Sequence, residues 1–121
     1  MQKILIIDDD RTTRLVIQKT LEKLGYQVIL AEHGAEGLAL ARAELPHLII
    51  CDVTMPVMDG FETFQEFRND PQLSPIPFVF LTADPNPEHL IDKMKLSEED
   101  YIPKPFSLSK LLSVLNVKLK K

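Results

Sequence analysis

Residues 4–10 read ILIIDDD, an apolar run that ends in three aspartates. Runs without polar alternation are typical of strands that are buried on both faces of a parallel sheet. Similar runs recur along the chain at residues 28–31, 48–51, 78–81 and, more weakly, 101–102. The sequence therefore predicts five short, mostly buried strands.

The segments between these runs have the spacing of amphipathic helices. In the last segment, leucines follow the i, i+3, i+4, i+7 pattern at positions 108, 111, 112, 115 and 119. Five alternations of strand and helix predict an α/β fold, namely a flavodoxin-like, doubly wound sheet of five parallel strands in the order 2-1-3-4-5 with five helices. Residues 1–121 are expected to form a single domain, because no linker or internal repeat is visible.

Composition and charge exclude several classes of function. The net charge of −4 argues against direct nucleic-acid binding, which depends on basic surface. No apolar run approaches the roughly 20 residues of a membrane span, and the four apolar residues before Asp8 are too few for a signal peptide. A single cysteine, Cys51, fits a reducing compartment. We therefore expect a cytoplasmic protein that does not contact membranes.

Polar residues follow four of the predicted strands. Asp8 and Asp9 follow the first, Asp52 the third, Thr82 ends the fourth and Lys104 comes just after the fifth. For the order 2-1-3-4-5, ligands bind beyond the carboxyl ends of the strands, between the first and third. These five side chains are therefore expected at one edge of the sheet.

This combination of residues suits phosphoryl transfer. Clustered carboxylates repel each other unless a cation compensates them, and an all-oxygen site favours Mg²⁺, with Mn²⁺ as a substitute. Asp52 would attack phosphorus, while Thr82 and Lys104 would hold the remaining phosphoryl oxygens.

Four motifs together resemble the receiver domain of two-component response regulators, of the chemotaxis-regulator type. The resemblance covers essentially the whole chain, in order and at the family's spacings. It is carried by the aspartates at 8 and 9, Asp52 with MPVMDG at 55–60, LTA at 81–83, and DYIPKPF at 100–106.

The resemblance implies a set of roles at the acidic site. Asp52 would be the phospho-accepting residue. Asp9 would bind the metal directly, Asp8 would act partly through water, and the backbone carbonyl of Thr54 would complete the coordination by the protein. No organic cofactor is implied.

The resemblance also implies a switch. Thr82 would hydrogen-bond the phosphoryl group and Lys104 would pair with it, while Tyr101 would turn inward as the threonine moves. The Lys104–Pro105 peptide is expected to be cis, and Gly60 is expected to adopt a positive φ. The chain departs from the family pattern at Ser97-Glu98 and at residues 84–87, which bear on the fourth helix and the signalling surface.

The implied partners are a histidine kinase or a histidine phosphotransfer protein as donor. The phosphorylated form would signal to a downstream protein or output domain through the face made by the fourth helix, fifth strand and fifth helix. Homodimerisation through this face is left open. Such a protein in a phosphorelay is a switch rather than an enzyme, beyond its own phosphorylation and dephosphorylation.

Three alternatives use the same fold. A magnesium-dependent phosphohydrolase would carry a second aspartate two residues after the nucleophile, where this chain has Thr54. A receiver-like interaction module that is never phosphorylated would normally lose some of these site residues. A flavin or nucleotide binder would need a glycine-rich loop after the first strand.

Among the remaining acidic residues, Asp10 is expected to be a helix N-cap and Asp59 a turn residue.

Overall fold

The computed structural model describes residues 2–53, 58–83, 92, 95–97 and 100–119. The longest described helix has 13 residues, and no described helix is long and apolar enough to cross a lipid bilayer. The predicted fourth helix falls on residues that lie, apart from residue 92, outside the described part. The elements are β1 (Lys3–Ile7), α1 (Arg11–Lys23), β2 (Gln27–Ala31), α2 (Gly34–Glu44), β3 (Leu48–Asp52), α3 (Gly60–Asn69), β4 (Phe78–Thr82), β5 (Tyr101–Pro103) and α5 (Leu108–Lys118).

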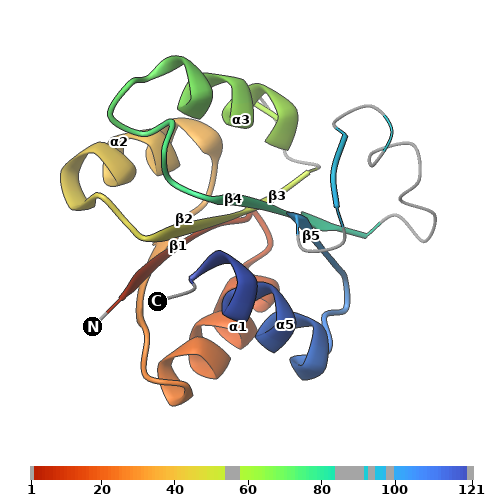
Figure 1. Cartoon of the computed structure of the whole chain (residues 1–121). Helices are drawn as coiled ribbons and strands as arrows, with labels where there is room; N and C mark the ends of the chain where they lie inside the picture. The colour runs from red at the N-terminus through yellow and green to blue at the C-terminus, as the bar shows by residue number, and fades with distance from the viewer. Residues whose placement is uncertain (1, 54–57, 84–91, 93–94, 98–99, 120–121) are drawn as a thin grey trace.

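The five strands form one parallel sheet in the order β2-β1-β3-β4-β5, which confirms the predicted topology. Helices α2 and α3 cover one face of the sheet, and α1 and α5 cover the other (Figure 1). Every residue of β3 and β4 is buried. Strands covered on both faces favour apolar side chains at successive positions, and this explains the unbroken apolar runs that precede Asp52 and Thr82.

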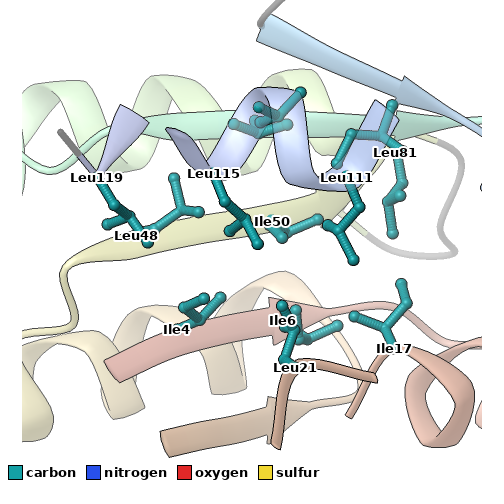
Figure 2. Close-up of a cluster of buried hydrophobic side chains, with 13 residues drawn as sticks. Ile4, Ile6, Ile17, Leu21, Leu48, Ile50, Leu81, Leu111, Leu115 and Leu119 are labelled. Atoms are coloured by element: carbon teal, nitrogen blue, oxygen red, sulfur yellow. The ribbon is translucent and has the colours of Figure 1, made fainter. Parts of the chain in front are cut away.

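Alternate residues of each strand supply two separate cores. One core lies between the sheet and helices α1 and α5, and Figure 2 shows it. Its strand residues include Ile4, Ile6, Leu48, Ile50 and Leu81, and its helix residues include Ile17, Leu21, Leu111 and Leu115. The intervening strand residues, such as Leu5, Ile7 and Ile49, belong to the core under α2 and α3. A register slip of one residue would exchange the two sets, so the packing specifies the register strongly.

An aromatic cluster packs α3 on the sheet. Ring centroids within the cluster lie 5.2 to 5.8 Å apart. Its members are Phe61, Phe64, Phe67, Phe78 and Phe80. The Arg68 guanidinium stacks 4.7 Å above the Phe64 ring and donates hydrogen bonds to the carbonyls of Ser74 and Ile76. Arg68 therefore ties the loop before β4 to the helix.

Side-chain caps begin the helices that lead away from the sheet edge. Asp10 accepts a hydrogen bond from the backbone N–H of Thr12, which confirms its predicted role as N-cap of α1. Asp59 was expected to be a turn residue, but it is the N-cap of α3 and forms a capping box with Glu62. The imidazole of His33 caps α2, which the sequence does not predict because histidine is not a favoured N-cap.

An ion pair joins the start of β5 to the end of α5. Lys118 Nζ contacts Asp100 Oδ1, and the backbone N–H and hydroxyl of Ser97 donate to Asp100 Oδ2 at 2.9 and 3.1 Å. Burial alone would raise the pKa of Asp100. The Lys118 and Ser97 contacts outweigh burial and hold the pKa of Asp100 below its ordinary value.

Replacing Asp100 with Asn should therefore destabilise the fold in a pH-dependent way. A carboxyl whose pKa is lower in the folded state stabilises the protein above its unfolded-state pKa, and this contribution disappears as the pH falls through the folded-state pKa. The expected loss at about pH 7 is up to about 1 kcal/mol, since the pair is only partly buried. Urea unfolding of parent and D100N, from neutral to acidic pH, measures the difference. A difference that grows towards acidic pH would contradict this account.

Candidate functional site

The parallel register brings the ends of four strands to one edge of the sheet. Ile7 of β1 pairs with Cys51 of β3, so the residues that follow them, Asp8 and Asp52, are neighbours. Asp52 in turn pairs with Leu81, the residue before Thr82. Thr82 pairs with Pro103, the residue before Lys104. The predicted convergence of these polar residues therefore follows directly from the strand register.

Three carboxylates form an acidic cluster at this edge. Carboxylate oxygens of Asp8, Asp9 and Asp52 all lie within 4.8 Å of one another. Asp8 is completely buried and Asp52 is 5% exposed, whereas Asp9 faces solvent. The cluster is therefore open on the side of Asp9 and closed by the sheet behind Asp8.

The ammonium group of Lys104 lies between two of these carboxylates. Lys104 Nζ is 2.9 Å from Asp8 Oδ2 and 3.3 Å from Asp52 Oδ2. The backbone N–H of Lys104 donates to the Thr82 carbonyl at 2.7 Å, which holds the residue at the end of β4. Burial lowers the pKa of Lys104, but Asp8 and Asp52 raise it by more, so the pKa lies above its ordinary value. Lys104 therefore remains charged and offsets the repulsion within the cluster. The Lys104–Pro105 peptide is cis, as predicted.

The chemistry of the donors fits a divalent cation. Asp8 Oδ2 is buried, and among the described residues the Lys104 ammonium, 2.9 Å away, is the one group that faces it. Such an oxygen retains lone pairs for a metal ion. All three side chains of the cluster offer oxygen, the ligand that Mg²⁺ prefers. The acidic triad is therefore of a type that holds Mg²⁺. Thr54, whose carbonyl was predicted as a further ligand, lies outside the described residues.

The hydroxyl and aromatic candidates occupy β4 and β5. Thr82 is the last residue of β4 and is 4% exposed. Tyr101 is the first residue of β5, pairs with Phe80 and is half-buried. The ammonium group of Lys110 from α5 lies 5.0 Å from the centre of the Tyr101 ring. Thr82 thus lies at the site edge, while Tyr101 lies two residues further back along the sheet.

A buried arginine is part of the site surroundings, and the sequence reasoning missed it. Arg14 Nη1 donates to the backbone carbonyl of Asp8 at 2.6 Å, and Arg14 Nη2 lies 3.4 Å from Glu32 Oε1. The sequence does carry a signal for this contact. Arg14 is spaced three and seven residues before Ile17 and Leu21, so it lies on the same buried face of α1 as these two residues. A charged residue on an apolar stripe, six positions after a candidate ligand, indicates a buried contact.

Gly60 serves a different purpose from the one predicted. It was expected to adopt a positive φ, but Gly25 is the described glycine that does so. Gly60 is the first residue of α3, and its N–H donates to the Val53 carbonyl at 2.8 Å. A Cβ atom at Gly60 would lie 2.5 Å from the Asp52 carbonyl oxygen and 2.7 Å from Val53 Cα. The glycine therefore permits α3 to approach the backbone that carries Asp52.

Comparison with known proteins gives this site its context. Residues 4–116 match the family model described as response regulator receiver domain. Protein PilH of Pseudomonas aeruginosa is 34% identical over 119 residues, which is 98% of each chain. The "Probable transcriptional regulator ycf27" of Porphyridium aerugineum is 38% identical over 110 residues, and the match covers 91% of this chain but 45% of that protein. The chain thus spans less than half of that relative's length.

Solved structures agree with the sequence comparisons. The chemotaxis response regulator CheY4 of Vibrio cholerae has a TM-score of 0.86 and 35% identity, over 98% of each chain. The chain therefore belongs to the response regulator receiver domain family of two-component signalling. Members of this family are typically signalling switches rather than enzymes.

Substituting Gly60 tests how closely α3 and β3 approach each other. Gly60→Ala should lower the free energy of unfolding by about 1–3 kcal/mol, because its Cβ meets backbone that cannot move aside without shifting Asp52. Gly60→Ser should cost at least as much. Urea unfolding followed by far-ultraviolet circular dichroism measures both. An alanine variant as stable as the parent would show that α3 shifts freely.

Proposed function

We propose that residues 1–121 form one receiver domain in which Asp52 accepts a phosphoryl group from the phosphohistidine of a histidine kinase or phosphotransfer protein. The observation that carries the proposal is the acidic cluster of Asp8, Asp9 and Asp52 with the Lys104 ammonium between its two buried members. This arrangement combines a nucleophile, oxygen ligands for a metal and an ammonium group that can pair with phosphoryl oxygens. Phosphoryl transfer depends on such positioned charge more than on an acid–base catalyst.

In the proposed transfer, an oxygen of Asp52 attacks phosphorus in line with the phosphorus–nitrogen bond of the donor. The phosphorus–oxygen bond forms as the phosphorus–nitrogen bond breaks, and the histidine leaves with the electron pair of that bond. Asp8, Asp9 and Asp52, with the Thr54 carbonyl, would hold Mg²⁺ (or Mn²⁺). The ion would neutralise charge on the phosphoryl oxygens.

The switch follows from a change of partner for Lys104. In the unphosphorylated protein its ammonium contacts Asp8 and Asp52, whereas the phosphorylated protein offers it a phosphoryl oxygen with more negative charge. We infer that Thr82 donates its hydroxyl to the same group and that Tyr101 turns inward to fill the space left behind. The phosphoryl group can shift the conformational population only by the contacts that are better in one state.

Part of the proposed output surface is described. Tyr101 of β5 and Lys110 of α5 contact each other on it, and the fourth helix would complete it. We infer that a downstream protein or an output domain binds here, without direct contact to nucleic acid, since the chain carries a net charge of −4. The cytoplasm is the proposed location, and homodimerisation through this face stays a prediction.

Phosphorylation by acetyl phosphate is the direct test. The parent should gain one phosphoryl group by intact mass when Mg²⁺ is present and none when EDTA removes the ion. Asp52→Asn should gain none, because an amide cannot form the acyl phosphate. Asp92→Asn, which alters an exposed aspartate, is the matched control and should be labelled like the parent.

Three results would redirect the proposal. Full labelling of D52N would show that another residue is the acceptor. Continuous hydrolysis of a small phosphomonoester would indicate a phosphohydrolase instead of a switch. A parent that takes up neither a phosphoryl group nor beryllofluoride would favour an interaction module that works without phosphorylation.

A further inference from the structure

Arg14 is an unusual residue in α1 because its side chain is both charged and buried. The Arg14 side chain is only 10% exposed. Among the residues that the structure describes, no other lysine or arginine is buried. It takes its place on α1 beside Ile17 and Leu21, which face the sheet. Burying a guanidinium is costly unless its donors are satisfied, so its contacts must compensate for lost hydration.

Those contacts join the carboxyl ends of two strands. Arg14 Nη1 donates at 2.6 Å to the carbonyl of Asp8, directly after β1. Arg14 Nη2 lies 3.4 Å from a carboxylate oxygen of Glu32, directly after β2. The Glu32 side chain is 69% exposed, so this second contact is screened by water. The short contact to the Asp8 carbonyl is therefore the stronger of the two.

The Asp8 carbonyl belongs to the peptide that connects the first two members of the acidic cluster. On the other side of this turn, Asp8 Oδ1 accepts the N–H of Asp10 at 2.9 Å, and Asp10 caps α1. Asp9 lies between these anchored residues and faces solvent. The anchored backbone on either side of Asp9 thus fixes the position from which its carboxylate can reach a metal ion.

We propose that Arg14 is a positioning residue for the divalent cation, acting through the Asp8–Asp9 peptide. This inference rests on the proposed magnesium site. Groups that orient metal ligands without touching the metal typically change affinity by about 10–100-fold when removed.

The charge of Arg14 acts in the opposite direction from its hydrogen bond. A nearby cation repels Mg²⁺, so loss of charge alone would tighten binding, whereas loss of the anchor weakens it. Glu32 offsets part of the charge, and the 2.6 Å hydrogen bond is direct, so the anchor dominates. The sign of the change in affinity therefore separates the two effects.

Isothermal titration of the metal-free protein with MgCl₂ tests the proposal. Arg14→Met keeps much of the side-chain volume and removes the donors, and it should weaken Mg²⁺ binding by about 10-fold or more. Arg14→Lys retains a cation and one donor towards the same carbonyl and should recover part of the affinity. Glu32→Gln removes only the charge of the outer partner, which water already screens, and should leave the affinity near that of the parent.

A second measurement needs no metal. The Asp10 N–H donates to Asp8 Oδ1 within the anchored turn, whereas the Val53 N–H donates to the Leu81 carbonyl beside β3. In metal-free R14M, hydrogen exchange of Asp10 should accelerate by a larger factor than that of Val53. A purely structural role would lower global stability alone, and this would accelerate the exposed Asp10 amide by no more than the Val53 amide.

Each outcome decides between defined alternatives. Unchanged or tighter Mg²⁺ binding by folded R14M, or equal acceleration at Asp10 and Val53, would overturn the role of Arg14. If R14M does not fold, the same two measurements on R14K decide, and parent-like values there would overturn it. A parent that binds no Mg²⁺ would overturn the proposed metal site as well, whereas a binding parent with unaffected variants overturns this inference alone.

Discussion

The contact of one ammonium group with two buried carboxylates is the constraint on which the site edge depends. Asp8 is inaccessible to solvent, and Asp52 nearly so, and both would be strongly disfavoured as anions without a counter-charge. Lys104 supplies that charge at 2.9 and 3.3 Å, and a backbone hydrogen bond to Thr82 holds it there. The last strand, which is only three residues long, thus helps stabilise the ends of β1 and β3.

The contact between Lys104 and the two carboxylates depends in turn on the register of the whole sheet. The site depends on the register of four parallel strands, which brings together Asp8, Asp52, Thr82 and Lys104. That register is enforced by the two cores, which use alternate residues of each strand. A core substitution that shifts one strand would therefore separate charges as well as create a cavity. Stability and chemistry are coupled in this fold through register.

The fold and most of the cluster are predictable from sequence, because they depend on patterns that a single segment carries. Unbroken apolar runs identify β3 and β4, and topology then gathers their polar ends. The roles of Gly60 and Arg14 are not predictable in this way. Whether a glycine serves a turn or a close approach depends on the backbone opposite it, here that of Asp52 and Val53. The partner of a buried cation likewise depends on the three-dimensional fold, which is why the contact of Arg14 with the Asp8 carbonyl was missed.

All the candidate site residues that the structure describes, apart from Tyr101, come from the carboxyl ends of strands or directly follow them, and the opposite edge of the sheet carries none. The fully described connections at that edge, residues 24–26, 45–47 and 70–77, return the chain to the next strand and contain none of the candidate site residues. At Gly25 nothing lies within 4 Å of the position where a side chain would begin, although its positive φ favours glycine at the position itself. A peptide tag or reporter domain joined at this point would be separated from the carboxylates by the length of a strand, about 17 Å. The molecule thus has one edge for chemistry and another at which it can be lengthened, labelled or fused.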